Sequence, residues 1–281
     1  MKRKLWIVTA SGADPGKTKR YYSSWKRLAV TEYRIVVVWN GAAGEPIPTG
    51  VVGSRNTLII EPNYLGVVPA FCLGIRAALA QAQPQDIICC LHDDVEILEQ
   101  DWDLKVLTHF DSHPNTVLAG FFGATGLGAD DIYQTPYDPM QLARRDCWSN
   151  MDDAEAHGQR SEVAKRAVCF DGFSQIMTVP LARVIVTALE RSHLTHHMYD
   201  SAIGALTARF CDINYGGDYE AWMIPVKCHH AGGQTAVGDQ GYQAWAKAKI
   251  AGGDQGFWDE SHRYFYEELR DVLPLRLKEE K

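Results

Sequence analysis

The chain has 281 residues, 46% of them hydrophobic, and a formal net charge of −7 at pH 7. A chain of this size can bury one large α/β core or two modest domains. Its negative charge argues against a general nucleic-acid or membrane-surface binder. No apolar run approaches the roughly 20 residues that a transmembrane helix needs. The cysteines number seven and show no C-x-x-C pair, which argues against disulfides and a zinc site and indicates a cytoplasmic protein.

The first hundred residues alternate between apolar runs and amphipathic segments. They predict strands at residues 5–10, 33–41, 58–60 and 87–91, and helices at residues 17–28 and 69–83. The run Ile87–Leu91 has five consecutive apolar residues, which is typical of a strand buried on both faces. The order predicts an α/β fold with a wound, GT-A-like (Rossmann-like), mostly parallel sheet flanked by helices.

Beyond residue 100 the pattern is less regular. Asp101 is expected to cap a helix that reaches Phe110, and a glycine-rich loop is expected at residues 120–128. The polar residues 130–165 are expected to form a long insertion or loop. Further strands are predicted at residues 117–122, 176–179 and 222–228, and helices at residues 180–191 and 201–210. We therefore expect a domain at 1–235 and a helical, aromatic-rich extension at 236–281 that packs on it.

His92-Asp93-Asp94 follows the strand Ile87–Leu91 directly. Parallel sheets place their ligand sites beyond the carboxyl ends of their strands. Two adjacent carboxylates at that edge would suit a divalent cation held together with the phosphates of a nucleotide. The alternative interpretation is a solvated acidic turn.

Ser11–Thr18, S-G-A-D-P-G-K-T, gives one candidate for the phosphate site. It lies between a predicted strand and a predicted helix and is close to G-x-x-x-x-G-K-[ST]. Ser11 stands where the tight loop needs glycine, and Pro15 lacks an N–H group for phosphate. A P-loop nucleotide hydrolase or kinase is therefore an alternative function, and an exposed Lys17 at a loop–helix junction is the simpler interpretation.

A second set of residues extends through most of the chain. It comprises Thr9-Ala10, Asn40, Gly66 with Ala70 and Gly74, His92-Asp93-Asp94, Asp171-Gly172-Phe173, Tyr199-Asp200 and His229-His230. In the order and spacing of these residues, the sequence from 5 to 235 resembles the GT-A glycosyltransferases, and among them the family-2-like inverting enzymes. His92-Asp93-Asp94 stands where that family has its D-x-D motif, with His92 in place of the first Asp.

The resemblance implies metal-dependent, inverting transfer of a sugar from a nucleotide-diphosphate sugar to an acceptor hydroxyl. Mn²⁺ or Mg²⁺ would neutralise the leaving diphosphate. Asp94 is the expected metal ligand from the acidic loop, and His229 or His230 would close the site from the C-terminal side. Imidazole suits manganese better than magnesium.

The resemblance also implies roles for the remaining polar residues. Asp200 matches the carboxylate that serves as catalytic base at the start of a helix, although an Asp there can equally be an N-cap. Asp93 would contact the ribose, Asn40 the edge of the base, and Arg76 would approach the diphosphate. The expected nucleotide-sugar contacts are Thr9, Ala10, Ser11, Asn40, Arg76, Asp93 and Asp94.

The acceptor is expected to be a glycan or a lipid-linked glycan. A modified DNA base is the alternative acceptor, since several basic residues could contact phosphates: Arg144, Arg145, Arg160, Lys165 and Arg166. A non-catalytic nucleotide- or sugar-binding module is the third class of function that the sequence leaves open.

Overall fold

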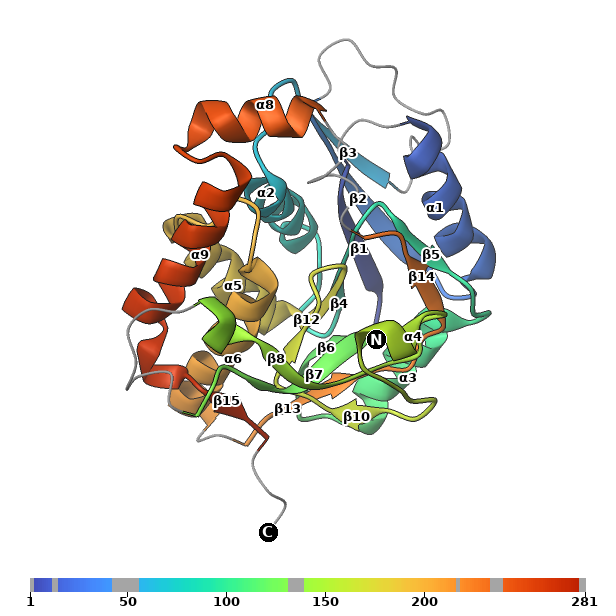
Figure 1. Ribbon diagram of the computed structural model, residues 1–281. Coiled ribbons are helices and arrows are strands. Elements are labelled where there is room, and N and C mark those ends of the chain that lie inside the picture. Colours follow the sequence, from blue (N-terminus) through green and yellow to red (C-terminus); the bar gives the residue numbers. More distant parts are fainter. Residues whose placement is uncertain are drawn as a thin grey trace.

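The computed structural model describes residues 3–11, 15–41, 56–130, 139–215, 218–232 and 240–277. Its centre is an eight-stranded sheet, shown in Figure 1. The strands of this sheet are β1 (Leu5–Ser11), β2 (Tyr33–Asn40), β3 (Asn56–Glu61), β4 (Ile87–Leu91), β6 (Thr116–Gly120), β10 (Lys165–Arg166), β12 (Ser174–Thr178) and β13 (Glu220–Met223). They lie in the order β10-β13-β6-β12-β4-β1-β2-β3.

Most neighbouring strands of the large sheet run parallel. This holds for β3, β2, β1 and β4, and again for β6 and β13. Strand β12 lies antiparallel between β4 and β6, and β10 runs antiparallel to β13. The predicted α/β class with a mostly parallel sheet is therefore confirmed.

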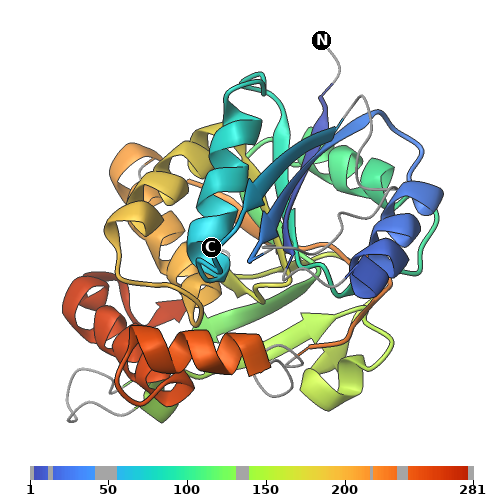
Figure 2. The same cartoon turned by 90° about the horizontal axis from the view of Figure 1, so that it is seen from above.

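Helices cover both faces of the sheet, as Figure 2 shows. One face carries α1 (Pro15–Leu28) and α3 (Trp102–Ser112), and the other carries α2 (Val67–Leu79), α5 (Val179–Arg191) and α6 (Tyr199–Tyr215). Successive side chains of β1 point to opposite faces of the sheet and join different hydrophobic cores. Ile7 packs in the cluster that holds Trp25, and Val8 packs in the cluster that holds Phe71.

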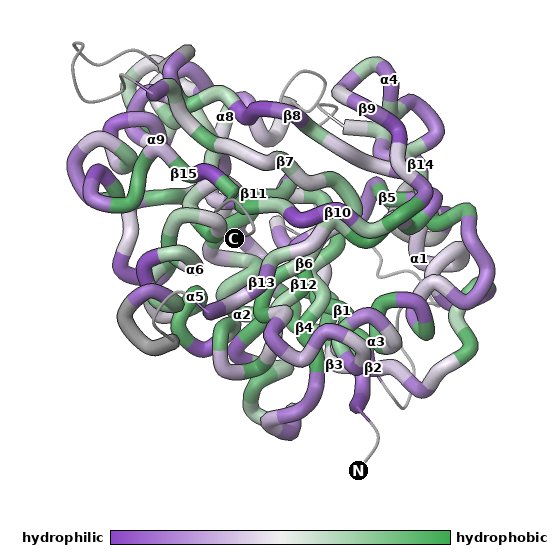
Figure 3. The backbone as a smooth tube through the Cα atoms, turned by 90° about the horizontal axis from the view of Figure 1, so that it is seen from below, coloured by the Kyte–Doolittle hydropathy of each residue, from purple (hydrophilic) through white to green (hydrophobic). Residues whose placement is uncertain are grey.

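Strand β4 matches its predicted bounds, and all five of its residues are buried. Cys89 and Cys90 belong to the hydrophobic clusters on opposite faces of the sheet, and all the cysteines are free. The hydrophobic residues concentrate in the central strands, whereas the exposed turns are hydrophilic (Figure 3). No helix in the described ranges is both long and apolar enough to cross a bilayer.

A second, smaller sheet was not predicted from the sequence. It contains β7 (Phe122–Leu127), β8 (Arg144–Ser149), β9 (Gln159–Arg160), β11 (Cys169–Phe170) and β15 (Leu275–Arg276). The glycine-rich loop predicted at residues 120–128 is thus wrong. Glycine is needed there for close packing: a Cβ on Gly123 would lie 2.9 Å from the Cβ of Ala167 and 3.0 Å from that of Met223.

The predicted insertion also contains regular structure. Besides β8 and β9, it includes the 3₁₀ helix η1 (Pro139–Leu142) and α4 (Ala154–His157), while residues 131–138 lie outside the described ranges. Asp101 precedes α3 as expected, but its φ is 61° and its side chain makes no cap hydrogen bond, so the predicted capping role is wrong. Its left-handed backbone departs from the extended conformation typical of an N-cap residue.

The C-terminal segment is helical, as predicted, but ends in a strand. It contains α8 (Gln240–Lys249), α9 (Asp254–Glu268) and the 3₁₀ helix η2 (Arg270–Val272), followed by β15. The predicted domain boundary at residue 235 falls outside the described residues. A two-stranded ladder of β5 (Val95–Ile97) and β14 (Cys228–His230) completes the fold.

A buried carboxylate fixes the turn that leads into β4. Asp86 is 2% exposed and accepts hydrogen bonds from the Lys4 N–H (3.0 Å), the Trp6 indole (3.1 Å) and the Gln83 N–H (2.9 Å). Asp86→Ala leaves these donors unpaired, so we expect the free energy of unfolding to fall by about 3 kcal/mol. Thermal melting should detect a loss of roughly 6–12 °C.

Asp111→Ala is the control, since Asp111 pairs with Arg3 on the surface and is 63% exposed. Exposed pairs contribute at most about 1 kcal/mol. Equal melting temperatures for the two variants would contradict the role assigned to Asp86.

Candidate functional site

A pocket of about 940 Å³ lies along the carboxyl ends of β1, β2 and β4. Ala10 and Ser11 line it from the end of β1, Asn40 from the end of β2, and Asp93 and Asp94 from the turn after β4. This is the edge at which parallel sheets bind ligands. The opposite walls come from the small sheet, from the first turn of α6 and from α9.

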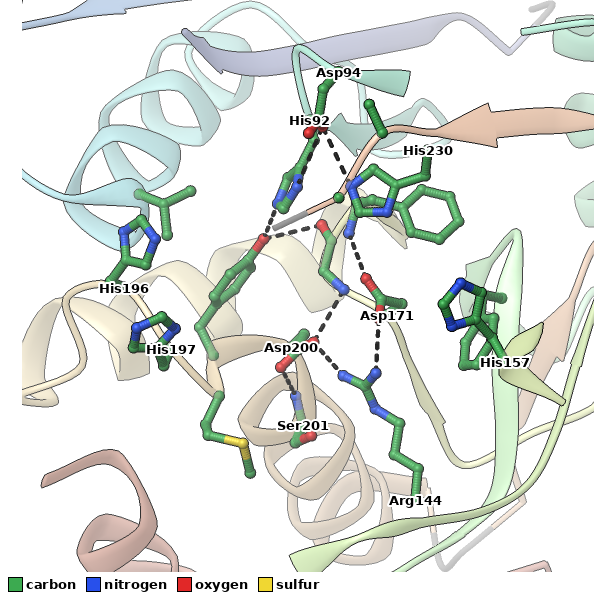
Figure 4. Close-up of a pocket in the computed structure, with 18 of the residues that line it drawn as sticks. His92, Asp94, Arg144, His157, Asp171, His196, His197, Asp200, Ser201 and His230 are labelled. Atoms are coloured by element: carbon green, nitrogen blue, oxygen red, sulfur yellow. Dashed lines mark hydrogen bonds and ion pairs between the residues drawn. The ribbon is translucent and has the colours of Figure 1, made fainter. Parts of the chain in front are cut away.

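Three potential metal ligands meet in this pocket. One ligand atom from each of His92, Asp94 and His230 lies within 4.8 Å of the other two. Figure 4 shows the three side chains gathered on one side of the pocket. The Asp94 Oδ1 atom is 3.3 Å from His230 Nε2 and 3.9 Å from His92 Nδ1. The side chain of Asp94 is only 9% exposed, so water screens its charge poorly.

Strand pairing decides which histidine joins Asp94. In the β5–β14 ladder His230 lies opposite Val95, which is the neighbour of Asp94, and the Ala231 N–H donates to the Asp94 carbonyl at 3.2 Å. Successive side chains of a strand point to opposite faces. His229 is therefore directed away from the pocket, where its Nδ1 lies 2.9 Å from Asp152. Of the two predicted candidates, the structure brings His230 to Asp94 and leaves His229 outside.

His92 is the member of the cluster that sequence reasoning missed. The Tyr199 hydroxyl donates its single hydrogen to the Gly172 carbonyl at 2.9 Å, and it lies 2.6 Å from His92 Nε2. The hydroxyl must therefore accept a hydrogen from Nε2, which leaves the lone pair of His92 on Nδ1, facing Asp94. A hydrogen bond of this kind fixes the tautomer of a metal-binding histidine.

The protonation states agree with this assignment. Burial lowers the pKa of His92 below its ordinary value, although Asp94 opposes the effect, so the imidazole is neutral and able to bind a metal. Burial, with the carboxylates of Asp200 and Asp171, raises the pKa of Tyr199 well above its ordinary value, so the phenol keeps its hydrogen. The signal in the sequence was the spacing of His92 and Asp94, two residues apart after a buried strand.

The donor set fits a divalent transition ion. Two imidazole nitrogens and one carboxylate oxygen converge from two separate segments, and imidazole is a better ligand for Mn²⁺, Fe²⁺ or Zn²⁺ than for Mg²⁺. Three protein ligands leave coordination positions for oxygens of a substrate. The cluster can therefore hold a metal that also binds a ligand in the pocket.

A second charged group lies beside the cluster. Arg144, from β8, donates to Asp171 through Nη1 at 2.8 Å and to Asp200 through Nη2. Asp200 also accepts hydrogen bonds from the Ser201 N–H (2.7 Å) and the Gly172 N–H (3.0 Å). Burial alone would raise the pKa of Asp171, but Arg144 and the nearby histidines outweigh it and lower that pKa. Figure 4 shows Arg144 directed at both carboxylates.

The turn Asp171-Gly172-Phe173 joins the two groups. The Phe173 carbonyl accepts the His92 N–H at 3.0 Å, and the Phe173 ring stacks on His230 with 4.6 Å between centroids. Gly172 has no space for a side chain, because a Cβ would lie 2.6 Å from the Tyr199 hydroxyl oxygen. The turn therefore fixes the positions of four residues relative to one another: His92, His230, Tyr199 and Asp200.

The predicted contacts at the ends of β1 and β2 differ in their surroundings. Ala10, Ser11 and Asp93 line the pocket, and the Ser11 hydroxyl donates to Asp93 at 2.9 Å. Asn40 also lines it, but its amide donates to the Gly66 carbonyl at 3.2 Å and accepts the Leu65 N–H at 2.9 Å. Thr9 is buried behind Ala10 and is not part of the lining.

Arg76 does not reach the pocket. It lies on the exposed side of α2, where its guanidinium pairs with Glu190 of α5 at 2.6 Å. Three of the residues proposed to contact DNA are also paired with carboxylates: Arg145 with Asp130, Arg160 with Glu155, and Arg166 with Glu220. Arg144 is directed into the pocket. These positions offer little unpaired positive charge for a nucleic-acid backbone.

The P-loop candidate lies only partly in the described residues. Ser11 ends β1 and α1 begins at Pro15, so the strand and helix that such a loop joins are present. Residues 12–14 and the side chain of Lys17 lie outside the described part. The P-loop function therefore stays an alternative.

The sequence matches no protein-family profile, and no curated protein is similar to it. Among solved structures, it is similar to a mannosyltransferase from Pyrobaculum calidifontis in complex with GDP-Man and Mn²⁺, with a TM-score of 0.44, 13% identity, and 97% of this chain and 72% of that chain covered. It is also similar to mouse xyloside xylosyltransferase 1 (TM-score 0.41, 12% identity, 84% and 99% covered). A third similar structure is S. aureus TarS 1–349 (TM-score 0.44, 10% identity, 95% and 73% covered). All three scores lie below 0.5, so these likenesses by themselves decide neither fold nor activity.

Tyr199→Phe tests the hydrogen bond that orients His92. The variant keeps the ring but loses the oxygen that accepts the Nε2 hydrogen, and losing such a partner typically costs 10–100-fold in metal affinity, about tenfold at least. Titration of Mn²⁺, followed by the electron paramagnetic resonance signal of the free ion, measures this loss. Tyr22→Phe is the control, since its hydroxyl contacts Asn56 on the far side of the sheet. Equal Mn²⁺ affinity in both variants would refute the assigned role.

Proposed function

We propose that this protein is a metal-dependent glycosyltransferase of the GT-A type. It would move a sugar, with inversion, from a nucleotide-diphosphate donor to an acceptor hydroxyl. The observation that carries the proposal is the His92, Asp94 and His230 cluster at the carboxyl end of β4, in a pocket bounded by the ends of β1 and β2. The resemblance of the sequence motifs to that class supports it as well.

In this proposal, His92, Asp94 and His230 hold Mn²⁺ in preference to Mg²⁺. The ion supplies positive charge that stabilises the leaving diphosphate. Asp93, which accepts a hydrogen bond from the Ser11 hydroxyl, lines the pocket and is the proposed contact of the ribose. Ala10 and Asn40 border the proposed space for the base, and both lie at the carboxyl ends of strands.

Asp200 is proposed as the base that takes the proton of the acceptor hydroxyl. An ionised carboxylate offers four lone-pair positions. Among the described residues, Arg144 and the Gly172 N–H occupy Oδ2, and the Ser201 N–H occupies one position on Oδ1. One position on Oδ1 is left for the acceptor. As the acceptor oxygen bonds to the anomeric carbon, the bond to the diphosphate breaks and the proton moves to Asp200.

The acceptor is proposed to be a glycan or a lipid-linked glycan. The pairing of Arg145, Arg160 and Arg166 with carboxylates disfavours a DNA acceptor. The wall formed by Tyr64, His196, Trp258 and His262 offers aromatic surface with neutral hydrogen-bonding groups. Such surfaces suit the faces and hydroxyls of sugar rings.

Thermal melting against nucleotides and nucleotide-sugars, each with and without Mn²⁺, tests the donor class. A ligand at 100 times its dissociation constant adds about 2.7 kcal/mol to stability. We expect stabilisation by one diphosphate sugar that depends on Mn²⁺ and is abolished by Asp94→Ala. Asp153→Ala is the control, because Asp153 lines the pocket outside the cluster.

Other outcomes of this melting experiment name the alternatives. Stabilisation by ATP or GTP with Mg²⁺, lost in Lys17→Ala and kept in Asp94→Ala, would establish the P-loop function instead. A third outcome is that a diphosphate sugar stabilises the protein but is neither transferred to any glycan acceptor nor hydrolysed by water. That outcome would indicate a binding module.

Asp200→Asn tests the base. Asparagine keeps one oxygen, which can still accept from Arg144 and the Gly172 N–H, and it loses the acceptor of the Ser201 N–H. We expect donor affinity to persist while turnover falls at least about 100-fold. Turnover is measured as release of the nucleoside diphosphate. Asp171→Asn is the comparison, since Asp171 binds the same arginine. A large loss in Asp171→Asn with little loss in Asp200→Asn would assign the base to Asp171.

A further inference from the structure

A residue with a strained backbone lies directly before the first turn of α6. Met198 has a φ of 60°, in the left-handed region that side chains other than glycine rarely adopt. It connects the loop after α5 to Tyr199 and Asp200, the first residues of α6. Such conformations persist only where the surrounding contacts enforce them, and they concentrate at functional sites.

The contacts on the N-terminal side of Met198 come from the C-terminal helices. His197 Nε2 donates to Asp254 Oδ1 at 2.5 Å, and the Tyr242 hydroxyl donates to the same oxygen at 2.7 Å. The His197 ring stacks on Trp258 with 4.1 Å between centroids and 11° between planes. His197 is 9% exposed, so this is a nearly buried contact between the loop and α9.

The contacts on the C-terminal side belong to the pocket. Tyr199 binds the Gly172 carbonyl and His92, and Asp200 binds the Gly172 N–H. Met198 is thus fixed between His197, which binds Asp254 of α9, and Tyr199, which binds Gly172 and His92. The contact of His197 with Asp254 is therefore one of those that oppose relaxation of the backbone at Met198, which is joined directly to Tyr199.

We propose that Asp254 and His197 are positioning residues, through which α9 sets the first turn of α6 and thereby the orientation of the metal ligand His92. The proposal rests on the metal site of the proposed function. It gives the aromatic C-terminal segment a role in the chemistry without any contact to the reacting atoms. Burial lowers the pKa of His197 below its ordinary value, so its neutral ring donates one hydrogen to Asp254.

The test is the Mn²⁺ affinity of the full chain, measured without donor by the resonance signal of the free ion. Asp254→Ala should weaken Mn²⁺ binding by up to about tenfold, the smallest loss expected when the Tyr199 hydrogen bond to His92 is itself removed. Asp254→Asn keeps an oxygen for His197 and Tyr242 and should bind Mn²⁺ nearly as the wild type does. Glu260→Ala, an exposed acid on the same helix, is the control for lost charge and should not change the affinity.

The strain at Met198 allows a sharper comparison. Glycine adopts a left-handed φ without steric cost, whereas alanine does not. Both replacements remove the methionine side chain. We therefore expect Asp254→Ala combined with Met198→Gly to recover Mn²⁺ affinity, and Asp254→Ala combined with Met198→Ala not to recover it. A merely destabilising effect of Asp254→Ala would not separate these two double variants.

His197→Phe keeps the proposal testable if Asp254→Ala does not fold. Phenylalanine retains the ring on Trp258 and loses the hydrogen bond to Asp254 together with the 3.3 Å contact with the Tyr242 hydroxyl, so the affinity should fall by a similar factor. Absence of Mn²⁺ binding in the wild type would overturn the proposed function. Mn²⁺ binding in the wild type that is unchanged in both Asp254→Ala and His197→Phe would overturn the positioning role alone.

Discussion

The backbone N–H and carbonyl of Gly172 hold the site together. Its N–H donates to Asp200 and its carbonyl accepts from Tyr199, so the first turn of α6 is fixed against the turn after β11. Tyr199 then extends the connection to His92, which follows β4. Because a Cβ at position 172 would collide with the Tyr199 hydroxyl, only glycine permits this approach. The metal cluster and the proposed base are therefore parts of one hydrogen-bonded unit.

The large sheet could be predicted from the sequence because its strands are marked by apolar runs. Ile87–Leu91 has no alternation, and it became the central strand β4 with its predicted bounds. Strand β7 could not be predicted in the same way, because its Gly123 packs closely against Ala167 and Met223, which lie far away in the chain. Glycine reads as a turn signal in a sequence unless the packing partner is known.

The candidate site was predicted in part for a related reason. The apolar run before them indicates that Asp93 and Asp94 follow the end of a strand, and both residues line the pocket. The choice between His229 and His230 depends on the register of β14 against β5, which no local pattern encodes. In the sequence, Arg144 resembled an exposed basic residue. The pairing of β8 with β7 is what brings its side chain to Asp171 and Asp200. Long-range pairing thus decides the members of the site.

Strand β15 has a consequence for the order of events during synthesis. Leu127 of β7 pairs with Arg144 on one side and with Leu275 on the other. This end of the small sheet is therefore complete only after β15 has left the ribosome. Until then β7 presents an unpaired edge there, of the kind that pairs readily with other chains. The strands of the central sheet are all synthesised before β15, so that sheet can form while the wall that carries Arg144 still lacks this neighbour.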